Sequence, residues 1–163
     1  MEIRDARESD LPGLLAIYND VIATSTAVYS YTPVSLEDRT QWWRARVGQG
    51  YPVLVALDES GVLGFSTFGD FRPWPGYRFT VEHSVHVRAD YRGKGFGRQL
   101  IQVLFPRAAA MNVHMMIAHI DSAAAASLRL HEKLGFEQVG TFHEVGQMKS
   151  GQWLSVVAMQ KRI

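Results

Sequence analysis

The sequence predicts an α/β fold, a mixed and mostly antiparallel sheet of about seven strands flanked by about four helices. Two observations carry this prediction. Stretches with strand-like alternation and stretches with helical spacing follow one another along the whole chain. In addition, no linker, charge block or internal repeat interrupts them, so residues 1–163 are predicted to form a single domain. A chain of this length with 47% hydrophobic residues can bury a sufficient core without disulfides or metal.

The first half of the chain is predicted to contain three strands and two helices. A short strand near residues 2–6 precedes a helix whose apolar residues recur at helical spacing from Leu11 to Ile22. Ser35, with Asp38 three residues later, predicts a capped second helix. Its Trp42–Trp43 pair is expected in the core or in a dimer contact rather than in a cofactor site. Two strands then follow, joined by a short turn that implies antiparallel pairing, at residues 51–57 and 62–69.

The second half contains the clearest strand in the sequence, residues 79–88. There Val81, His83, Val85 and Val87 alternate with Glu82, Ser84, His86 and Arg88, which predicts two distinct faces. After a glycine-rich turn we expect a helix at 97–110, a strand at 114–120, a helix at 123–134 and strands at 136–146 and 152–160. Pro106 lies inside the first of these helices and is expected to kink it, because proline lacks a backbone donor.

Charge and composition exclude several classes of protein. Seventeen Lys and Arg residues against 16 Asp and Glu leave a net charge of +1, so no long-range field favours nucleic acid or an anionic membrane as a partner. The charged N-terminal residues favour a cytoplasmic protein over a secreted one. Zero cysteines exclude a disulfide framework and a cysteine nucleophile. The six histidines show no ligand spacing, so no metal site is predicted.

The glycine-rich turn at residues 92–98 is the strongest local signal for a ligand. Gly93, Gly95 and Gly97 alternate between a strand and a helix, which lets backbone amides converge on an anion at the helix N-terminus. The spacing fits neither the G-x-G-x-x-G dinucleotide fingerprint nor the G-K-[ST] of a Walker loop. Taken alone, the segment is equally consistent with a plain connection.

With Arg92, Gly95 and Gly97 at its defining positions, the turn resembles the R-x-x-G-x-G pyrophosphate loop of the GNAT superfamily of N-acetyltransferases. A second superfamily signature is present downstream, at residues 127–136. Across its length the chain is similar to the phosphinothricin and methionine sulfoximine acetyltransferase subfamily, including segments at 3–6, 51–55, 68–72, 80–85 and 143–146. The resemblance implies a GNAT fold, acetyl-CoA as the acetyl donor and a homodimer.

The resemblance also implies a set of acetyl-CoA contacts. It assigns them to Val85, His86, Val87, Arg92, Gly93, Lys94, Gly95, Phe96, Gly97, Arg98, Ala124 and Lys133. The strand residues would contact the pantetheine arm and the thioester oxygen through their backbone, and the loop amides would hold the pyrophosphate. The family usually has an asparagine where this chain has Ala124, so one polar contact, with a free energy of about 1 kcal/mol, is expected to be missing.

Three residues are expected to be catalytic. Glu82 matches the carboxylate that the family keeps beside the incoming amine, and a general base is needed there because an ammonium must lose its proton before it attacks. His143 matches a histidine close to the substrate. His131 replaces the tyrosine with which most of the superfamily protonates the coenzyme thiolate, so the acid is either His131 or water. On the residues alone, Glu82 and His143 can also be side chains of exposed strands without a catalytic role.

The acceptor is predicted to be a small amino acid with an oxyanion-like side chain. The loop from Asp70 to Arg78 combines arginines, which suit sulfone or phosphinate oxygens, with rigid prolines and aromatic walls; a merely solvated loop is the alternative. The expected acceptor contacts are Arg72, Pro73, Trp74, Arg78, Glu82, His83, Ser84 and Tyr31.

The resemblance therefore implies direct acetyl transfer from acetyl-CoA to the α-amino group of an amino acid such as methionine sulfoximine, methionine sulfone or phosphinothricin. Without a cysteine, the chain cannot carry the acetyl group on a thiol between the two substrates. Two alternatives stay open at this stage. One is a non-catalytic acyl-CoA-binding module, and the other is an N-acetyltransferase for peptides or proteins.

Overall fold

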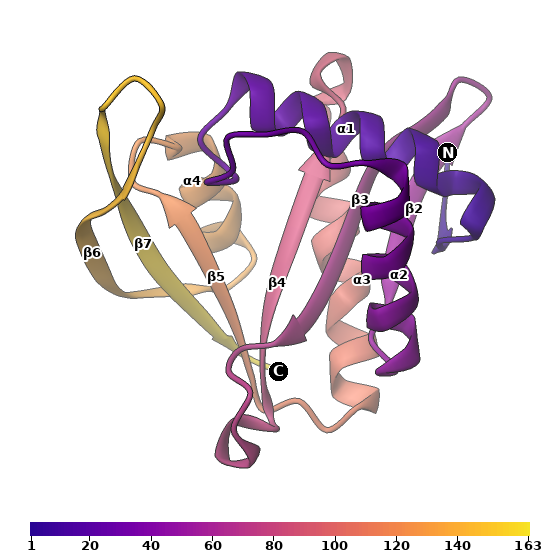
Figure 1. The fold of residues 1–163 in the computed structure, drawn as a ribbon. Coiled ribbons are helices and arrows are strands. Elements are labelled where there is room, and N and C mark those ends of the chain that lie inside the picture. Colours follow the sequence, from indigo (N-terminus) through magenta and orange to yellow (C-terminus); the bar gives the residue numbers. More distant parts are fainter.

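The computed structural model describes residues 1–163 and contains one seven-stranded sheet in the order β1-β2-β3-β4-β5-β7-β6 (Figure 1). The strands are β1 Glu2–Asp5, β2 Val53–Asp58, β3 Gly61–Asp70, β4 Thr80–Val87, β5 Met115–Asp121, β6 Glu137–Gln147 and β7 Trp153–Arg162. All neighbouring strands are antiparallel except β4 and β5, which run parallel. The fold class and the sheet predicted from the sequence are confirmed.

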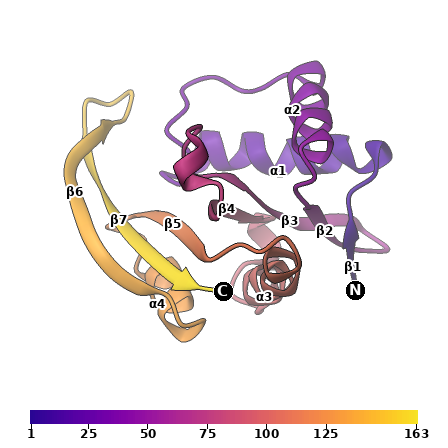
Figure 2. The same cartoon turned by 90° about the horizontal axis from the view of Figure 1, so that it is seen from below.

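Four α-helices cover the two faces of the sheet. They are α1 Leu11–Thr24, α2 Leu36–Gly48, α3 Phe96–Ala110 and α4 Ala125–Lys133. Figure 2 shows α1 and α2 on one side of the sheet and α3 and α4 on the other. The main core lies under α3 and is built around Phe68, Met116 and Leu104, whereas a smaller cluster under α1 includes Leu14 and Phe65. Neither α1 nor any other helix is long and apolar enough to cross a membrane.

The neighbouring strands β4 and β5 separate along their length. β4 pairs with β5 only from Thr80 to Glu82, opposite Met115 to Ile117. Beyond these residues each strand keeps its outer partner, since β4 pairs with β3 as far as Val87 and β5 pairs with β7 as far as Asp121. Figure 1 shows the resulting V, which opens away from the paired end. The facing backbone edges of β4 and β5 are therefore left without strand partners and can hydrogen-bond to a ligand.

The predicted cap of α2 is present, because the Ser35 hydroxyl accepts from the backbone amide of Asp38 at 3.1 Å. Pro106 lies inside α3 as expected, and the helix continues past it to Ala110 as one element. β6 is irregular, since its pairing with β7 shifts register between Gln138 and Gly140 and again between Phe142 and Gly146, and Glu144 adopts a positive φ of 50°.

Candidate active site

The cleft of the molecule lies where β4 and β5 separate, beneath α1 and α2. Its volume is about 410 Å³. The floor is formed by β4 residues on the α1 and α2 side of the sheet, Glu82, Ser84 and His86, together with His119 and Asp121 of β5. The predicted alternation of β4 is confirmed, because His83 stacks on His131 of α4 while His86 contacts Tyr18 of α1. Both faces of this strand are therefore covered.

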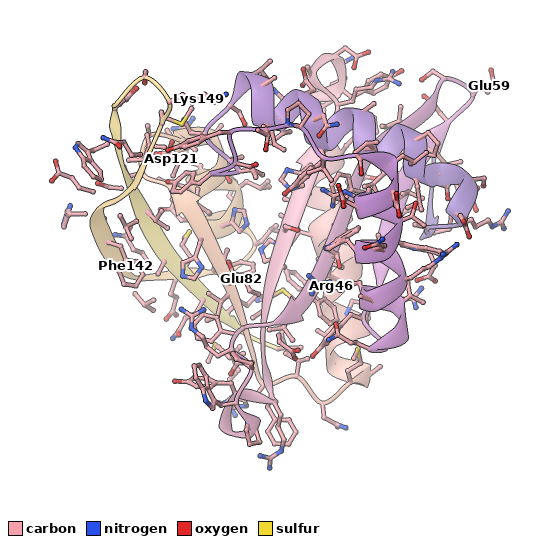
Figure 3. All side chains as sticks on the ribbon, viewed as in Figure 1. Arg46, Glu59, Glu82, Asp121, Phe142 and Lys149 are labelled. Atoms are coloured by element: carbon pink, nitrogen blue, oxygen red, sulfur yellow. The ribbon has the colours of Figure 1, made fainter.

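Glu82 is the last residue of β4 that pairs with β5, and its side chain points into the cleft (Figure 3). Oε1 of Glu82 lies 2.8 Å from Nδ1 of His119 on β5. The rings of Phe71 and Phe142 flank His119 at centroid distances of 6.2 Å, which fixes the imidazole plane. Glu82 and His119 also line a second, adjoining cavity of about 510 Å³, so the pair connects the two cavities.

His131 and His83 form a buried pair under the cleft. Nδ1 of His131 lies 2.7 Å from the Ser127 carbonyl oxygen, and its Nε2 lies 3.2 Å from Nε2 of His83. A ring nitrogen that faces a carbonyl carries the proton, so His131 is protonated at Nδ1 and accepts at Nε2 from His83. Nδ1 of His83 then has a buried lone pair without a partner. Burial lowers the pKa of His131, and burial together with the neighbouring His131 lowers the pKa of His83 to about 3.

Two arginines of α2 form the wall of the cleft opposite the sheet. Arg39 is stacked between aromatic rings, with its guanidinium carbon 3.7 Å from the ring centre of Tyr18 and 4.5 Å from that of Trp42. Burial, followed by the positive charges of Arg39 and Arg92, lowers the pKa of the nearby His86 to about 4. Arg46 lies over the backbone of Gly69, where a Cβ would overlap its guanidinium group. A side chain at position 69 would therefore displace this guanidinium group.

The glycine-rich turn lies at the open end of β4 and leads directly into α3. Gly93 and Gly95 adopt positive φ values of 74° and 86°, which a side chain would strain, and Gly95 is the residue before the helix. Nε of Arg92 donates to the Val87 carbonyl at 3.0 Å and so ties the turn to the end of β4. The exposed residues Lys94 and Arg98 add positive charge near the first amides of α3. Such a turn fits the oxygens of a phosphate or pyrophosphate.

The structure brings some of the other predicted site residues to the cleft and leaves others outside it. Val85 and Ala124 line the cleft, and Arg72 lines the second cavity. By contrast, Pro73, Trp74 and Arg78 are exposed, and the guanidinium of Arg78 stacks on Phe79 instead of reaching a cavity.

Three further predicted residues lie at the margins of the site. Tyr31 is exposed, and its hydroxyl donates to the Gln147 carbonyl at the end of β6. His143 is exposed on β6, in the segment where the pairing with β7 shifts. Lys133 is exposed at the end of α4 and lines neither of the two cavities. In this single chain, these three side chains do not face the floor of the cleft.

Sequence reasoning missed four residues of the cleft: Arg39, Arg46, His119 and Asp121. The sequence does contain a signal for the two arginines, because a spacing of seven residues places two side chains on the same face of a helix. It contains no such signal for His119 and Asp121. Their proximity to Glu82 depends on the parallel register between β4 and β5, which strand alternation alone does not reveal.

The splayed strands, the phosphate-binding turn and the carboxylate in the cleft together define an acetyltransferase site of the GNAT type. The chain belongs to the Acetyltransferase (GNAT) family, whose model matches residues 14–136. An L-methionine sulfoximine/L-methionine sulfone acetyltransferase from Pseudomonas paraeruginosa is 55% identical over 159 residues, which cover 97% of this chain and 92% of that protein. The superfamily and subfamily predicted from the sequence are confirmed.

Solved structures show the same architecture. A ribosomal-protein-alanine N-acetyltransferase from Brucella melitensis superposes with a TM-score of 0.97 at 45% identity over the whole of both chains. The structure of yncA from Salmonella typhimurium, described with its cofactor acetyl-CoA, has a TM-score of 0.96 at 40% identity and covers 99% of this chain and 93% of that one. The predicted GNAT fold is therefore confirmed over essentially the full length.

Proposed function

We propose that this protein transfers the acetyl group of acetyl-CoA to the α-amino group of a small amino acid such as methionine sulfoximine, methionine sulfone or phosphinothricin. The observation that carries the proposal is the position of Glu82. Its carboxylate lies in a cleft of amino-acid size, at the point where the backbone edge of β4 becomes free. The 55% identity to an enzyme named for two of these acceptors supports the same acceptor class.

The residues present fit acetyl-CoA at one end of this cleft. The free edge of β4 from Val85 to Val87 offers backbone groups to the pantetheine arm, and the amides between Gly93 and Arg98 suit the pyrophosphate. The donor supplies an activated acetyl thioester. The chain supplies its orientation, together with a backbone amide that stabilises negative charge on the thioester oxygen during transfer. Ala124 lines the cleft without a polar side-chain contact, so binding relies on the backbone and on local cations.

In this mechanism Glu82 accepts a proton from the acceptor ammonium, which leaves a neutral amine as the nucleophile. His119 holds Oε1 of Glu82 and so orients the carboxylate toward the cleft. His131 has no free proton for the departing thiolate, because its Nδ1 proton is hydrogen-bonded to the Ser127 carbonyl and its Nε2 is an acceptor. We therefore assign that proton to water rather than to His131.

The open loop between β3 and β4 is the proposed acceptor side of the site. Arg72 lines the second cavity together with Glu82, at a place where it can meet the oxyanion side chain of the acceptor. Pro73, Trp74 and Arg78 complete the loop, and in our proposal they and His143 approach the acceptor when the cleft is filled or when a second subunit packs beside it. A peptide acceptor is the second candidate, favoured by the name of the Brucella melitensis structure.

We further propose that the protein is a homodimer and acts in the cytoplasm, where acetyl-CoA and free amino acids occur together. The support for a dimer is a group of large apolar side chains on β6 and β7 that are more than half exposed: Val139, Phe142, Val145 and Trp153. Several large apolar side chains exposed on edge strands are typical of a protein interface.

The decisive test is the release of free coenzyme A from acetyl-CoA by the purified protein. A panel of acceptors comprises methionine sulfoximine, methionine sulfone, phosphinothricin, the common amino acids and peptides that begin with alanine. We expect release only with free amino acids, and fastest with the sulfoximine or the sulfone. Preference for the peptides would favour the second candidate, whereas acetyl-CoA binding without any transfer would contradict the proposal.

A further inference from the structure

Arg39 is a buried cation without a carboxylate beside it. Only 5% of its surface is exposed, and none of the salt bridges in the structure includes it. The guanidinium stacks on the rings of Tyr18 and Trp42, which fixes its plane, and its buried Nε has no hydrogen-bond partner. A cation removed from water costs folding free energy unless an anion compensates it. Because Arg39 lines the cleft, a ligand can be that anion.

Arg46 presents a second cation to the same cleft, two helical turns further along α2. Seven residues at about 100° each return to nearly the same face of a helix, so the two guanidinium groups follow one line along the cleft. Arg46 lies on Gly69, and Gly69 is the residue opposite Glu82 in the register of β3 with β4. No carboxylate lies within 4.0 Å of Arg46.

The sheet wall of the cleft has the opposite charge. Glu82 of β4 and Asp121 of β5 are the carboxylates that line it, and Figure 3 labels both, together with Arg46 of α2. The cleft is thus negative on the sheet side and positive on the α2 side. An amino-acid zwitterion has this same separation of charge, with an ammonium group and a carboxylate on one carbon atom. A simple amine or an internal peptide residue lacks the negative half.

We propose that Arg39 and Arg46 form the subsite for the α-carboxylate of the acceptor. With the ammonium directed to Glu82, the carboxylate of the same molecule faces the α2 wall. Guanidinium groups bind carboxylates through two parallel hydrogen bonds, so the subsite also sets the direction of the amine. The inference rests on the proposed function and adds to it a reason why free amino acids are preferred to amines, amides and peptides.

The test compares two acceptors that differ only at this group, methionine sulfone and its α-carboxamide. The measured quantity is the ratio of their kcat/KM values, since a loss of stability alone lowers both values together. We expect the wild-type protein to favour the carboxylate. In Arg39→Gln and in Arg46→Gln the ratio falls at least about tenfold, because a charge-assisted hydrogen bond is lost with one acceptor only. KM for acetyl-CoA stays unchanged in Arg46→Gln.

Two further variants keep the test informative if Arg39→Gln does not fold. Gly69→Ala leaves every charge in place but displaces Arg46, so the ratio falls there as well. Arg44→Gln is the matched control, because Arg44 is on the same helix but is exposed and paired with Glu8 at 2.9 Å. A ratio that stays within twofold of wild type in both Arg46→Gln and Gly69→Ala overturns the subsite. Absence of transfer to every acceptor by the wild-type protein would instead contradict the proposed function.

Discussion

At the scale of single residues, the properties of the site follow from which polar groups are paired and which are not. Glu82 has a partner in His119, and its second carboxylate oxygen is free for an incoming ammonium. His83 keeps a buried lone pair with no partner, and burial, together with the neighbouring His131, lowers its pKa. At position 69 the guanidinium of Arg46 occupies the space that a Cβ would fill. Each of these features is local, and each can be tested by one substitution.

Removing the charge of Glu82 should prevent proton transfer from the acceptor but leave the protein folded. We expect Glu82→Gln to lower kcat at least about 100-fold, the usual contribution of a general base, while the affinity for acetyl-CoA is retained. Stopped-flow release of coenzyme A and calorimetric titration of acetyl-CoA measure the two effects. Glu59→Gln is the control, because Glu59 is an exposed carboxylate on the turn between β2 and β3, far from Glu82 (Figure 3). An unchanged rate in Glu82→Gln would show that another group accepts the proton.

The buried histidines should make the protein less stable in acid. The pKa values of His83 and His86 are lowered to about 3 and about 4 from 6.5, so below pH 6.5 the unfolded chain binds protons that the folded chain does not. The free energy of unfolding therefore decreases as the pH is lowered below 6.5, by up to about 1.4 kcal/mol per pH unit for each histidine. Urea denaturation at pH 7.5 and 5.5 measures this change.

Two variants attribute the acid effect to these residues. His86→Gln removes one of the three histidines whose pKa is lowered, so the free energy of unfolding should change less between the two pH values. His114→Gln removes an exposed histidine and should leave the change as in the wild type. Equal pH dependence in His86→Gln and the wild-type protein would contradict the assignment.

At the scale of elements, the site is produced by three junctions rather than by any one strand or helix. β4 and β5 separate after Glu82, the turn after β4 enters α3 through left-handed glycines, and α2 lies over β2 and β3. The first junction exposes the backbone edge of β4, the second brings the backbone amides of the turn together, and the third places Arg39 and Arg46 at the cleft. In the proposed mechanism, donor and acceptor therefore approach opposite ends of one cleft.

The glycine-rich turn allows a matched comparison of strain with function. Gly95 and Gly151 have nearly the same φ, 86° and 87°, and a Cβ on either would meet no atom within 4 Å. Alanine at either position should therefore destabilise the fold by a similar amount, about 1 to 2 kcal/mol. Only Gly95→Ala should weaken acetyl-CoA binding, because Gly151 lies in the turn between β6 and β7. Thermal unfolding and calorimetry measure the two effects, and equal acetyl-CoA affinities would exclude the turn from the donor site.

At the scale of the whole molecule, the two edge strands of the sheet differ in length and in the apolar surface that they expose. β1 is a short edge strand, whereas β6 is a long edge strand with several large apolar side chains in solvent. The interior needs no help from a second subunit, since the main core of 14 buried residues is complete within one chain. Association is therefore expected to cover an edge and the acceptor loop rather than to complete the fold.

A charge on the apolar edge should separate the proposed dimer. Val139 is 54% exposed on β6, so Val139→Asp is expected to yield folded monomers, because a carboxylate cannot be buried in an apolar interface without a partner. Val47 is similarly exposed, at 47%, but lies on α2, and Val47→Asp should leave the mass unchanged. Sedimentation equilibrium measures the mass. A wild-type monomer would contradict the dimer, and a dimeric Val139→Asp would place the interface elsewhere.

The sequence by itself determined the order of helices and strands, the glycine-rich turn and the place of Glu82 on an alternating strand. These features depend on periodicity, capping and backbone freedom, which act between residues close together in the chain. Only the tertiary structure decided that β4 pairs with β5 for three residues and then separates, and that Glu82 meets His119 across that boundary. It also decided that Arg39 and Arg46 face the cleft without carboxylate partners. Such contacts join segments far apart in sequence, whose register and charge pairing are set by packing rather than by local propensity.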